Sequence, residues 1–337
     1  MTQRRPTQSD VARLAGVSVS TVSKALNGVG EMKSETRQRV VEAADRLGFT
    51  LLNRARAEVR ERSYTVGLIT TDHFGRFTGP VMLGVEDALG AGRISVLLAD
   101  GRGDRIRESH YVETFLARRV DGIIVTGRRA ESRLPLTNRD KVPTVYVLSR
   151  SDDPADVSVV IDDEQGGTLS VEHLLSVGRR RIACVTGPKD HLAARLRTKG
   201  ARAALGATGL TEAVPTLWGP WSEEWGRRAA ALALLADSEI DGFVCGSDQI
   251  ARGLVDGLRA HGVSVPSKVS VVGFDNWDVM AEASSPPLTT VDPQLERLGR
   301  FAAKTLLQMI AGEEHPAGVL PQPCRLEIGG SSIPMTP

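Results

Sequence analysis

Polar side chains that could bind a small hydroxylated ligand follow the apolar, β-branched runs of this sequence, where each run ends. They are Asp72, His73, Asp162, Arg197, Ser247 and Asp275. Because ligands of open α/β sheets bind at the carboxyl ends of the strands, we expect these side chains to converge. Carboxylates accept hydrogen bonds from pairs of hydroxyl groups, and a guanidinium donates as a planar fork. The set therefore predicts a binding site for a small polar ligand.

Lys24 indicates a second kind of chemistry. It is the only long cationic side chain in the segment VSTVSKALN, residues 19–27. The O6 and N7 atoms of guanine are natural acceptors for a lysine, so Lys24 is a candidate for reading a base in DNA. The alternative is a lysine that contacts only solvent.

No constellation typical of an enzyme or a metal site accompanies these residues. The histidines and carboxylates are scattered, and the sequence holds no P-loop, GxSxG or HExxH pattern. Cys184, Cys245 and Cys324 lie far apart without a CxxC spacing, which gives no indication of a metal site or a disulfide framework. We therefore expect a binding protein that is not an enzyme and needs no metal or cofactor.

Three short helices near the N-terminus must position Lys24. Thr7 with Asp10 is typical of a capping box, Gly16 ends the helix that starts there, and Ser18 caps the next one. A third helix is expected over residues 34–47. So tight a turn indicates a helix-turn-helix unit whose second helix enters a DNA major groove, the alternative being an αα-hairpin that packs on another element. The residues expected to face inward are Val11, Leu14, Ala15, Val22, Ala25, Leu26, Val40, Val41, Ala44 and Leu47.

The charge of the chain is unevenly distributed. Through Arg62 it carries 12 Lys and Arg against 7 Asp and Glu, whereas the remainder carries 30 against 34. A basic head ahead of a mildly acidic remainder favours a polyanion as the partner of the head alone.

From residue 64 onward the pattern changes to alternating strands and helices, as a parallel sheet requires. The alternation occurs twice, so two similar α/β lobes are expected. The expected strands are residues 64–70, 94–100, 121–127, 143–149, 181–187, 241–247 and 269–275, with a last strand at 325–328.

The N-terminal segment resembles the LacI/GalR family of bacterial transcription regulators. The matching residues are Thr7, Asp10, Val11, Ala12, Ala15, Gly16, Val17, Ser18, Thr21, Val22, Ser23, Asn27, Thr36 and Arg37. The resemblance implies that Val19, Ser20 and Lys24 read bases. It also implies that Ser18, Thr21 and Asn27 contact phosphates or stabilise the turn.

The family has a short hinge helix after the head, which inserts an apolar wedge into the minor groove. In residues 49–63 the sequence departs from that pattern. One register keeps Arg56 in a matching DNA-binding position but puts Glu58 at the wedge, and a shift by one residue puts Val59 there. Since a carboxylate repels phosphate, Val59 is the better candidate, and the absence of any wedge stays open.

The resemblance continues as GVEDAL, VEHLLSVGRRRIA, SDQIARG, SVVGFD and PPLTTV, and so covers nearly the whole chain. It implies an all-α helix-turn-helix domain followed by an α/β, two-lobed, periplasmic-binding-protein-like domain with parallel sheets flanked by helices. The expected boundaries are 1–62 for the head with its hinge, 63–162 and 291–318 for the N-terminal lobe, and 163–290 and 319–332 for the C-terminal lobe.

The family's effector ligands fall on Arg197 and Asp275, and its stacking aromatic falls on Trp221 of the GPW stretch. The alternatives are an interlobe salt bridge for Arg197 and a helix N-cap for Asp275. Ser247 replaces the family's usual asparagine, so the identity of the effector does not carry over.

These observations predict a DNA-binding regulator, by preference a repressor, controlled by a carbohydrate-like effector. A homodimer on a near-palindromic operator is expected, because a two-fold operator matches a two-fold protein. With no signal peptide and no membrane-spanning run in the sequence, we expect a cytoplasmic location and no membrane partner. The alternative, a sugar-binding receptor for transport, has no use for a basic helix-turn-helix head.

Overall fold

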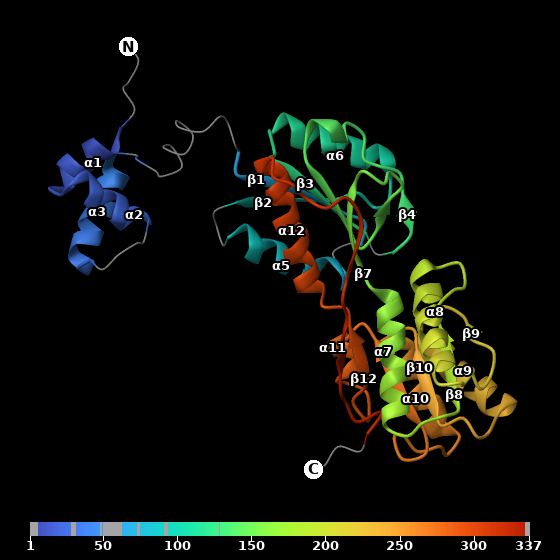
Figure 1. Ribbon diagram of the computed structural model, residues 1–337. Helices are drawn as coiled ribbons and strands as arrows, with labels where there is room; N and C mark the ends of the chain where they lie inside the picture. The colour runs from blue at the N-terminus through green and yellow to red at the C-terminus, as the bar shows by residue number, and fades with distance from the viewer. Residues whose placement is uncertain are drawn as a thin grey trace. The chain divides into compact units, whose positions relative to one another are not determined.

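The computed structural model describes residues 6–27, 32–47, 49, 63–72, 75–90, 94–127 and 129–333. The chain divides into two compact units, Met1–Ser63 and Tyr64–Pro337 (Figure 1). Among the described residues, no helix has the length and apolar character needed to span a membrane.

The first unit contains helices α1 (Gln8–Ala15), α2 (Val19–Asn27) and α3 (Ser34–Leu47). The expected caps are present. Thr7 and Asp10 form a reciprocal capping box, and Gly16 ends α1 in the left-handed conformation with φ +67°. The Ser18 hydroxyl accepts a hydrogen bond of 3.1 Å from the Thr21 amide, so it caps α2.

The core of this unit is made by apolar residues from all three helices, including Val11, Val22 and Val40, which are fully buried. Two sequence-based expectations are wrong, because Leu14 is 49% exposed and Val41 is 42% exposed. Ala12 and Ala43 are buried instead. The other expected inward residues are buried or partly buried, and alanines take part in the packing where the exposed leucine and valine do not.

The second unit contains two six-stranded sheets. The first sheet is entirely parallel, and in the second only β14 pairs antiparallel with its neighbour β12. The first sheet has the order β13 (Gly318–Gln322), β7 (Val157–Ile161), β5 (Thr144–Val147), β3 (Gly122–Thr126), β1 (Thr65–Thr70), β2 (Ser95–Asp100). The second has the order β14 (Arg325–Glu327), β12 (Thr289–Asp292), β11 (Ser270–Phe274), β10 (Gly242–Cys245), β8 (Ile182–Thr186), β9 (Leu217–Trp218). Short strands β4 (Ser132–Arg133) and β6 (Arg150–Ser151) form a separate pair.

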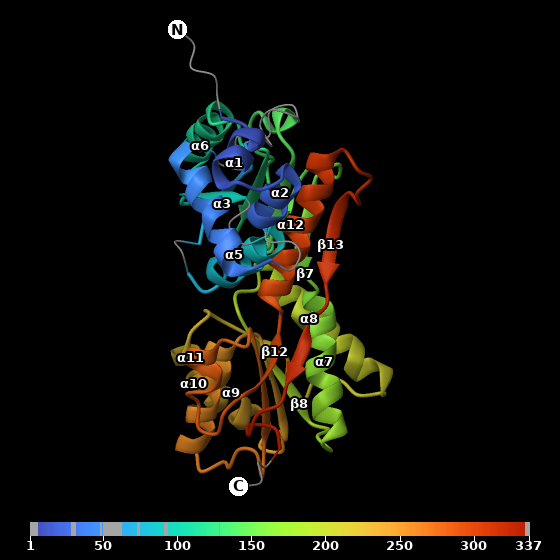
Figure 2. The same cartoon turned by 90° about the vertical axis from the view of Figure 1, so that its left-hand side faces the viewer.

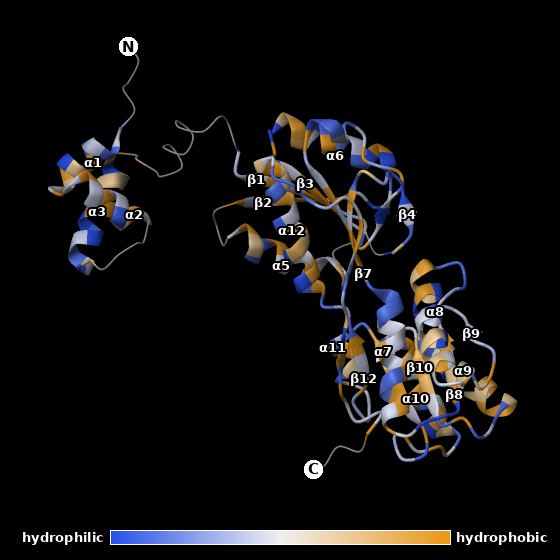
Figure 3. Ribbon diagram, viewed as in Figure 1, coloured by the Kyte–Doolittle hydropathy of each residue, from blue (hydrophilic) through white to orange (hydrophobic). Residues whose placement is uncertain are grey.

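Helices cover both faces of each sheet, and the buried strands are hydrophobic on both sides (Figure 3). Such strands are typical of parallel sheets. The first sheet packs against α5 (Thr78–Leu89) and α12 (Leu295–Ala311) on one face and α6 (Arg105–Ala117) on the other. The second packs against α7 (Asp163–Ser176) and α8 (Leu192–Ala207), with α9 (Glu223–Ala236) and α10 (Asp248–Ala260) opposite. The one-turn helix α11 (Asp278–Ala281) follows β11.

The chain crosses between the lobes three times, from β7 to α7, from β12 to α12 and from β13 to β14. Figure 2 shows β7, β12 and β13 near the junction of the lobes. Each lobe is therefore assembled from separate segments of the chain. The crossings place the carboxyl end of β7 and the start of α7 at the boundary between the lobes.

Helices α7 and α8 touch through their backbones. A Cβ atom on Gly200 would lie 1.8 Å from the carbonyl oxygen of Glu164, and one on Gly167 would lie 2.0 Å from that of Arg197. Only glycine permits so close an approach, which holds α8, and Arg197 with it, against α7.

Replacing Gly200 by alanine is therefore expected to lower the free energy of unfolding by about 1–3 kcal/mol, since the methyl group forces the two helices apart. Gly206, in the same helix, is a matched control because nothing lies within 4 Å of a Cβ there. Gly206→Ala should be neutral or stabilising by up to about 1 kcal/mol. Equal effects of the two substitutions in urea unfolding would refute the argument.

Candidate functional site

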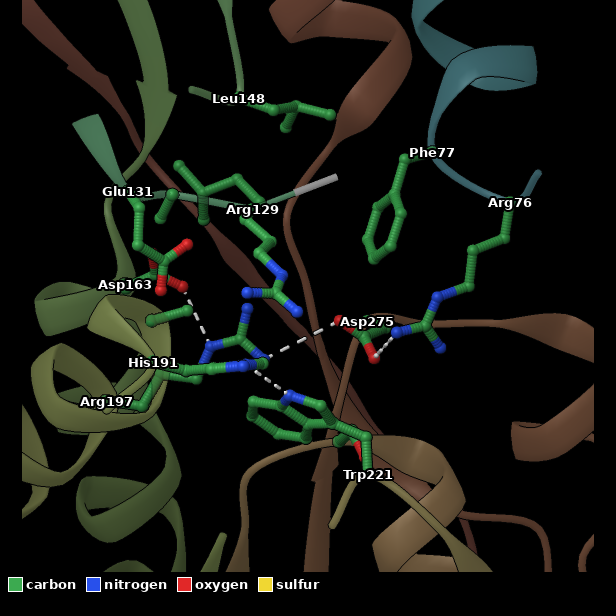
Figure 4. Close-up of a pocket in the computed structure, with 14 residues that line it drawn as sticks. Arg76, Phe77, Arg129, Glu131, Leu148, Asp163, His191, Arg197, Trp221 and Asp275 are labelled. Atoms are coloured by element: carbon green, nitrogen blue, oxygen red, sulfur yellow. Dashed lines mark hydrogen bonds and ion pairs between the residues drawn. The ribbon is translucent and has the colours of Figure 1, made fainter. Parts of the chain in front are cut away.

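A cavity of about 290 Å³ lies between the two lobes of the second unit (Figure 4). Residues of both lobes line it, from the loops at the carboxyl ends of the strands and the helices that follow. They are Arg76, Phe77, Arg129, Ala130, Glu131, Leu148, Ile161, Asp163, His191, Ala193, Arg197, Trp221, Ser247 and Asp275.

Arg197 lines this cavity and is only 8% exposed. Its Nε donates to Asp163 Oδ1 at 2.8 Å, and its Nη1 donates to the Gly246 carbonyl at 2.6 Å and lies 3.6 Å from Asp275 Oδ1. The guanidinium also stacks on Phe274, 3.4 Å from the ring centroid. All these partners belong to the second lobe, so the expected salt bridge exists but does not join the lobes.

Asp275 directly follows β11 and has a φ of +111°, which is uncommon for a residue other than glycine. Its side chain is not a helix cap. The carboxylate lies between two guanidinium groups, with Arg76 Nη2 at 3.2 Å from Oδ2. Oδ2 is nevertheless buried without a hydrogen-bond donor. A strained backbone that aims an unsatisfied acceptor into a cavity is typical of a binding site.

Among the described residues, two polar contacts join the lobes across the cavity. One is the ion pair between Arg76 and Asp275, and the other is a 2.8 Å hydrogen bond from the Leu192 amide to Glu131 Oε1. Glu131 thereby places a carboxylate at the N-terminus of α8, where the helix dipole favours negative charge. The Arg76 guanidinium also lies 4.9 Å from the centroid of the Trp277 ring in the second lobe. Opening or closing the cleft must change both polar contacts.

Burial and charge together set the electrostatics of the site. Burial raises the pKa of Asp163, although the Arg197 guanidinium opposes this. Burial by itself lowers the pKa of Arg197, but the carboxylates of Asp163 and Asp275 outweigh it and raise that pKa overall. The pKa of Asp248 is raised to about 8, mainly because the side chain is buried and secondly because of the charge of Asp275. Asp248 therefore holds a proton near neutral pH.

We expect this proton to make stability depend on pH. Because the pKa of Asp248 is raised in the folded state, its contribution to stability is present below its unfolded pKa of about 4 and is lost as pH rises through about 8. Asp248→Asn, which mimics the protonated side chain, should remove this loss and become relatively more stable with rising pH. Urea unfolding between pH 5 and pH 9 tests this, and parallel curves for the two proteins would contradict it.

Trp221 lines the cavity, and its indole Nε1 donates a 2.8 Å hydrogen bond to His191 Nδ1. The indole N–H is therefore already used within the protein. The bond fixes the orientation of the ring, so what Trp221 offers a ligand is its face.

Four of the residues selected from the sequence line the cavity, namely Arg197, Trp221, Ser247 and Asp275. The Ser247 hydroxyl also caps α10 by accepting from the Ile250 amide at 3.3 Å.

Asp72 and Asp162, which the sequence analysis expected to bind the effector, are not among the residues that line this cavity. The Asp72 carboxylate accepts from the amides of Phe77 and Thr78 at the start of α5, and Asp162 caps α7 through the Gln165 amide. Short polar side chains at a strand-to-helix turn satisfy free amides, which points them away from the ligand. His73 lies outside the described residues.

Arg76, Arg129, Glu131, Asp163 and His191 line the cavity but were not selected from the sequence. Asp163 is adjacent to the selected Asp162, and Arg76 lies four residues after Asp72 in the sequence. The ends of the predicted strands therefore indicated the correct region of the chain. They did not indicate which of the neighbouring side chains points into the cavity.

In the helical unit, the proposed base-reading residues Val19, Ser20 and Lys24 are exposed, as groove contacts require. Ser18 and Thr21 are connected through their hydroxyls at 2.8 Å, in addition to the cap of α2. Asn27 is the last residue of α2, but its side chain is not among the parts that the structure describes. Arg56 and Val59 lie outside the described residues.

Comparison with known proteins agrees with this architecture. Residues 7–50 match the family profile described as bacterial regulatory proteins, lacI family, and residues 171–332 match the periplasmic binding protein-like domain. The HTH-type transcriptional regulator CelR of Thermobifida fusca is 34% identical over 321 residues, covering 92% of this chain and 94% of that protein.

Two solved structures are similar over almost the whole chain. One is a transcriptional regulator CelR–cellobiose complex, with a TM-score of 0.66 and 29% identity over 97% of this chain and 100% of that one. The other is the lac repressor dimer bound to operator and the anti-inducer ONPF, with a TM-score of 0.68 and 25% identity over 98% and 99% of the two chains.

A helix-turn-helix unit followed by a two-lobed unit with a cavity between its lobes defines a DNA-binding transcription regulator that responds to a small molecule. The chain belongs to the LacI family of bacterial regulators.

Proposed function

We propose that the protein is a homodimeric repressor that binds a near-palindromic operator and changes its operator affinity when a small carbohydrate-like effector binds between the lobes. It acts by binding alone, without catalysis, in the cytoplasm where the operator is. Its helix-turn-helix unit and its family relatives favour this function over that of a transport receptor.

The cavity is the observation that carries the proposal. Two ion-paired guanidinium groups, a buried carboxylate oxygen without a hydrogen-bond donor and an oriented indole face line the same cavity. Forked donors and bidentate acceptors suit vicinal hydroxyls, and an aromatic face suits the apolar side of a sugar ring.

Effector binding can change operator affinity only if the effector prefers one arrangement of the lobes, and this coupling is reciprocal. The interlobe contacts of Arg76 and Glu131 are interactions that a change in the arrangement of the lobes would alter. Operator titrations at fixed salt, with and without neutral and acidic sugars and beginning with cellobiose, test the proposal. Operator affinity unaffected by every small molecule that binds the cavity would refute it.

Lys24→Ala is expected to cost about 1–3 kcal/mol of binding free energy on the specific operator and much less on random DNA. The side chain is exposed on α2, so its loss should not disturb the fold. Fluorescence anisotropy with both duplexes at the same salt concentration measures this difference.

The salt dependence of binding distinguishes the two roles of this lysine. A residue that contacts a base lowers specific affinity, whereas one that contacts phosphate lowers both affinities and reduces the salt slope by about one. Equal losses on operator and random DNA would therefore assign Lys24 to the phosphate backbone.

A further inference from the structure

One cation in the cavity has no acidic partner. Arg76 and Arg197 are held by Asp275 and Asp163, but Arg129 forms no ion pair or hydrogen bond through its side chain among the described residues. Figure 4 shows its guanidinium extending into the cavity toward Arg197 and Asp275. The other lining charges are matched, because Asp163 and Asp275 form ion pairs with Arg197 and Arg76, and Glu131 accepts a hydrogen bond from the Leu192 amide.

A second cavity, of about 340 Å³, lies in the first lobe and shares Arg129 and Glu131 with the first. Four arginines line it against two glutamates, Glu108 and Glu131. Arg133 is held by Glu108, and Arg102 lies 3.6 Å from Asp100, but Arg105 has no acidic partner among the described residues. The two cavities are thus adjacent and share part of their lining, and the lining of the second has an excess of positive charge.

Ser149 provides an independent observation at this end. It lines the second cavity, is only 5% exposed, and its hydroxyl has no hydrogen-bond partner. A buried hydroxyl without a partner is uncommon, and a ligand oxygen is a physical explanation for it.

We propose that the effector is an anionic carbohydrate whose phosphate or carboxylate group binds Arg129, with Arg105 and Ser149 completing the subsite. Its sugar ring then lies between Trp221 and Asp275. The proposal rests on the proposed function and specifies the chemical class of the effector. Closing the lobes over an unpaired guanidinium is unfavourable because burial removes its hydration, and an anion offsets that loss.

Binding of matched probes to the full-length protein tests the chemical class. Isothermal titration with glucose, galactose, mannose and cellobiose is compared with the corresponding hexuronates and hexose 6-phosphates. At least one anionic sugar should bind more than about tenfold more tightly than its neutral parent, because charge-assisted hydrogen bonds are stronger. The uronates and phosphates distinguish the two anionic groups. If only neutral sugars bind, or no anionic sugar binds at millimolar concentration, the proposal is wrong.

Substitution of Arg129 tests the subsite. Arg129→Gln should weaken binding of the best anionic sugar by about 10- to 100-fold, with Arg129→Lys restoring part of the affinity. Arg118→Gln, at an exposed arginine that ends α6, is the matched control and should bind like wild type. Equal affinity of Arg129→Gln and wild type for the anionic sugar would overturn the assignment.

Operator titrations separate this inference from the proposed function. An anionic sugar that binds through Arg129 without changing operator affinity supports the subsite and refutes the effector role. A neutral sugar that controls operator affinity while anionic sugars do not bind supports the proposed function and refutes the anionic subsite.

Discussion

Replacing Arg197 by alanine is expected to lower the free energy of unfolding by about 3–5 kcal/mol, because the carboxylate of Asp163 is then left buried without its partner. Asp163 is 2% exposed, and Arg197 is its hydrogen-bonded cation. Loss of the guanidinium also leaves the Gly246 carbonyl without the donor that lies 2.6 Å away.

A neighbouring ion pair on the same two helices provides the control. Lys199 on α8 and Glu164 on α7 are 2.8 Å apart, but the lysine side chain is 66% exposed. Exposed pairs contribute about 0–1 kcal/mol, so Lys199→Ala should change little. Chemical denaturation of both variants measures the contrast, and similar losses would show that burial is not the cause.

The pH dependence of the Arg197 variant gives a second readout. The pKa of Asp163 is already raised by burial, and removing the opposing guanidinium raises it further. The variant should therefore regain part of its stability as pH falls, since the folded state takes up a proton more readily than the unfolded chain. If the loss is the same at acidic and neutral pH, an unpaired Asp163 does not explain it.

This expectation changes how effector experiments on Arg197 are interpreted. If Arg197 served only as an effector ligand, as the family resemblance implies, Arg197→Ala would bind operator normally and lose only the effector response. The structure places the side chain in a buried network of the second lobe, so the same substitution also weakens the lobe itself. A lost response in this variant does not by itself assign a ligand contact.

Local sequence patterns were sufficient to predict most helices and strands, but they did not predict the position of every side chain in the site. Thr7, Gly16 and Ser18 marked the helix ends correctly, because caps depend on residues only a few positions apart. Strands β7, β12 and β13 were not assigned from the sequence, and all three lie at the crossings between the lobes.

Side-chain direction at a strand end was the main source of error in the site. Asp162 and Asp163 have the same chemistry and adjacent positions, yet the first caps α7 and the second binds Arg197. Arg129 could not be selected, because its importance depends on which arginines lack acidic partners, and pairing is a property of the folded chain.

Asp275 is the better residue for testing the effector site, because Asp275→Asn keeps the shape of the side chain and asparagine tolerates a positive φ. The substitution removes the charge that faces the cavity, so we expect it to cost about 2–5 kcal/mol of effector binding, as for other buried charged contacts. By reciprocity the effector should then no longer change operator affinity, whereas affinity without effector should remain.

Arg76→Gln separates a ligand contact from an effect on the lobes. Both substitutions remove the 3.2 Å ion pair between Arg76 and Asp275, but only Asp275→Asn removes the buried carboxylate whose Oδ2 has no donor. If that oxygen binds effector hydroxyls, Arg76→Gln should retain more of the effector affinity than Asp275→Asn. The pH dependence of the free energy of unfolding checks that the site is otherwise intact. In an intact site, removing the charge of Asp275 lowers the pKa of Asp248, so stability should depend less on pH than in the wild type. Equal loss of effector binding in the two variants would assign the effect to the interlobe ion pair, and an unchanged response in Asp275→Asn would exclude Asp275 from the effector site.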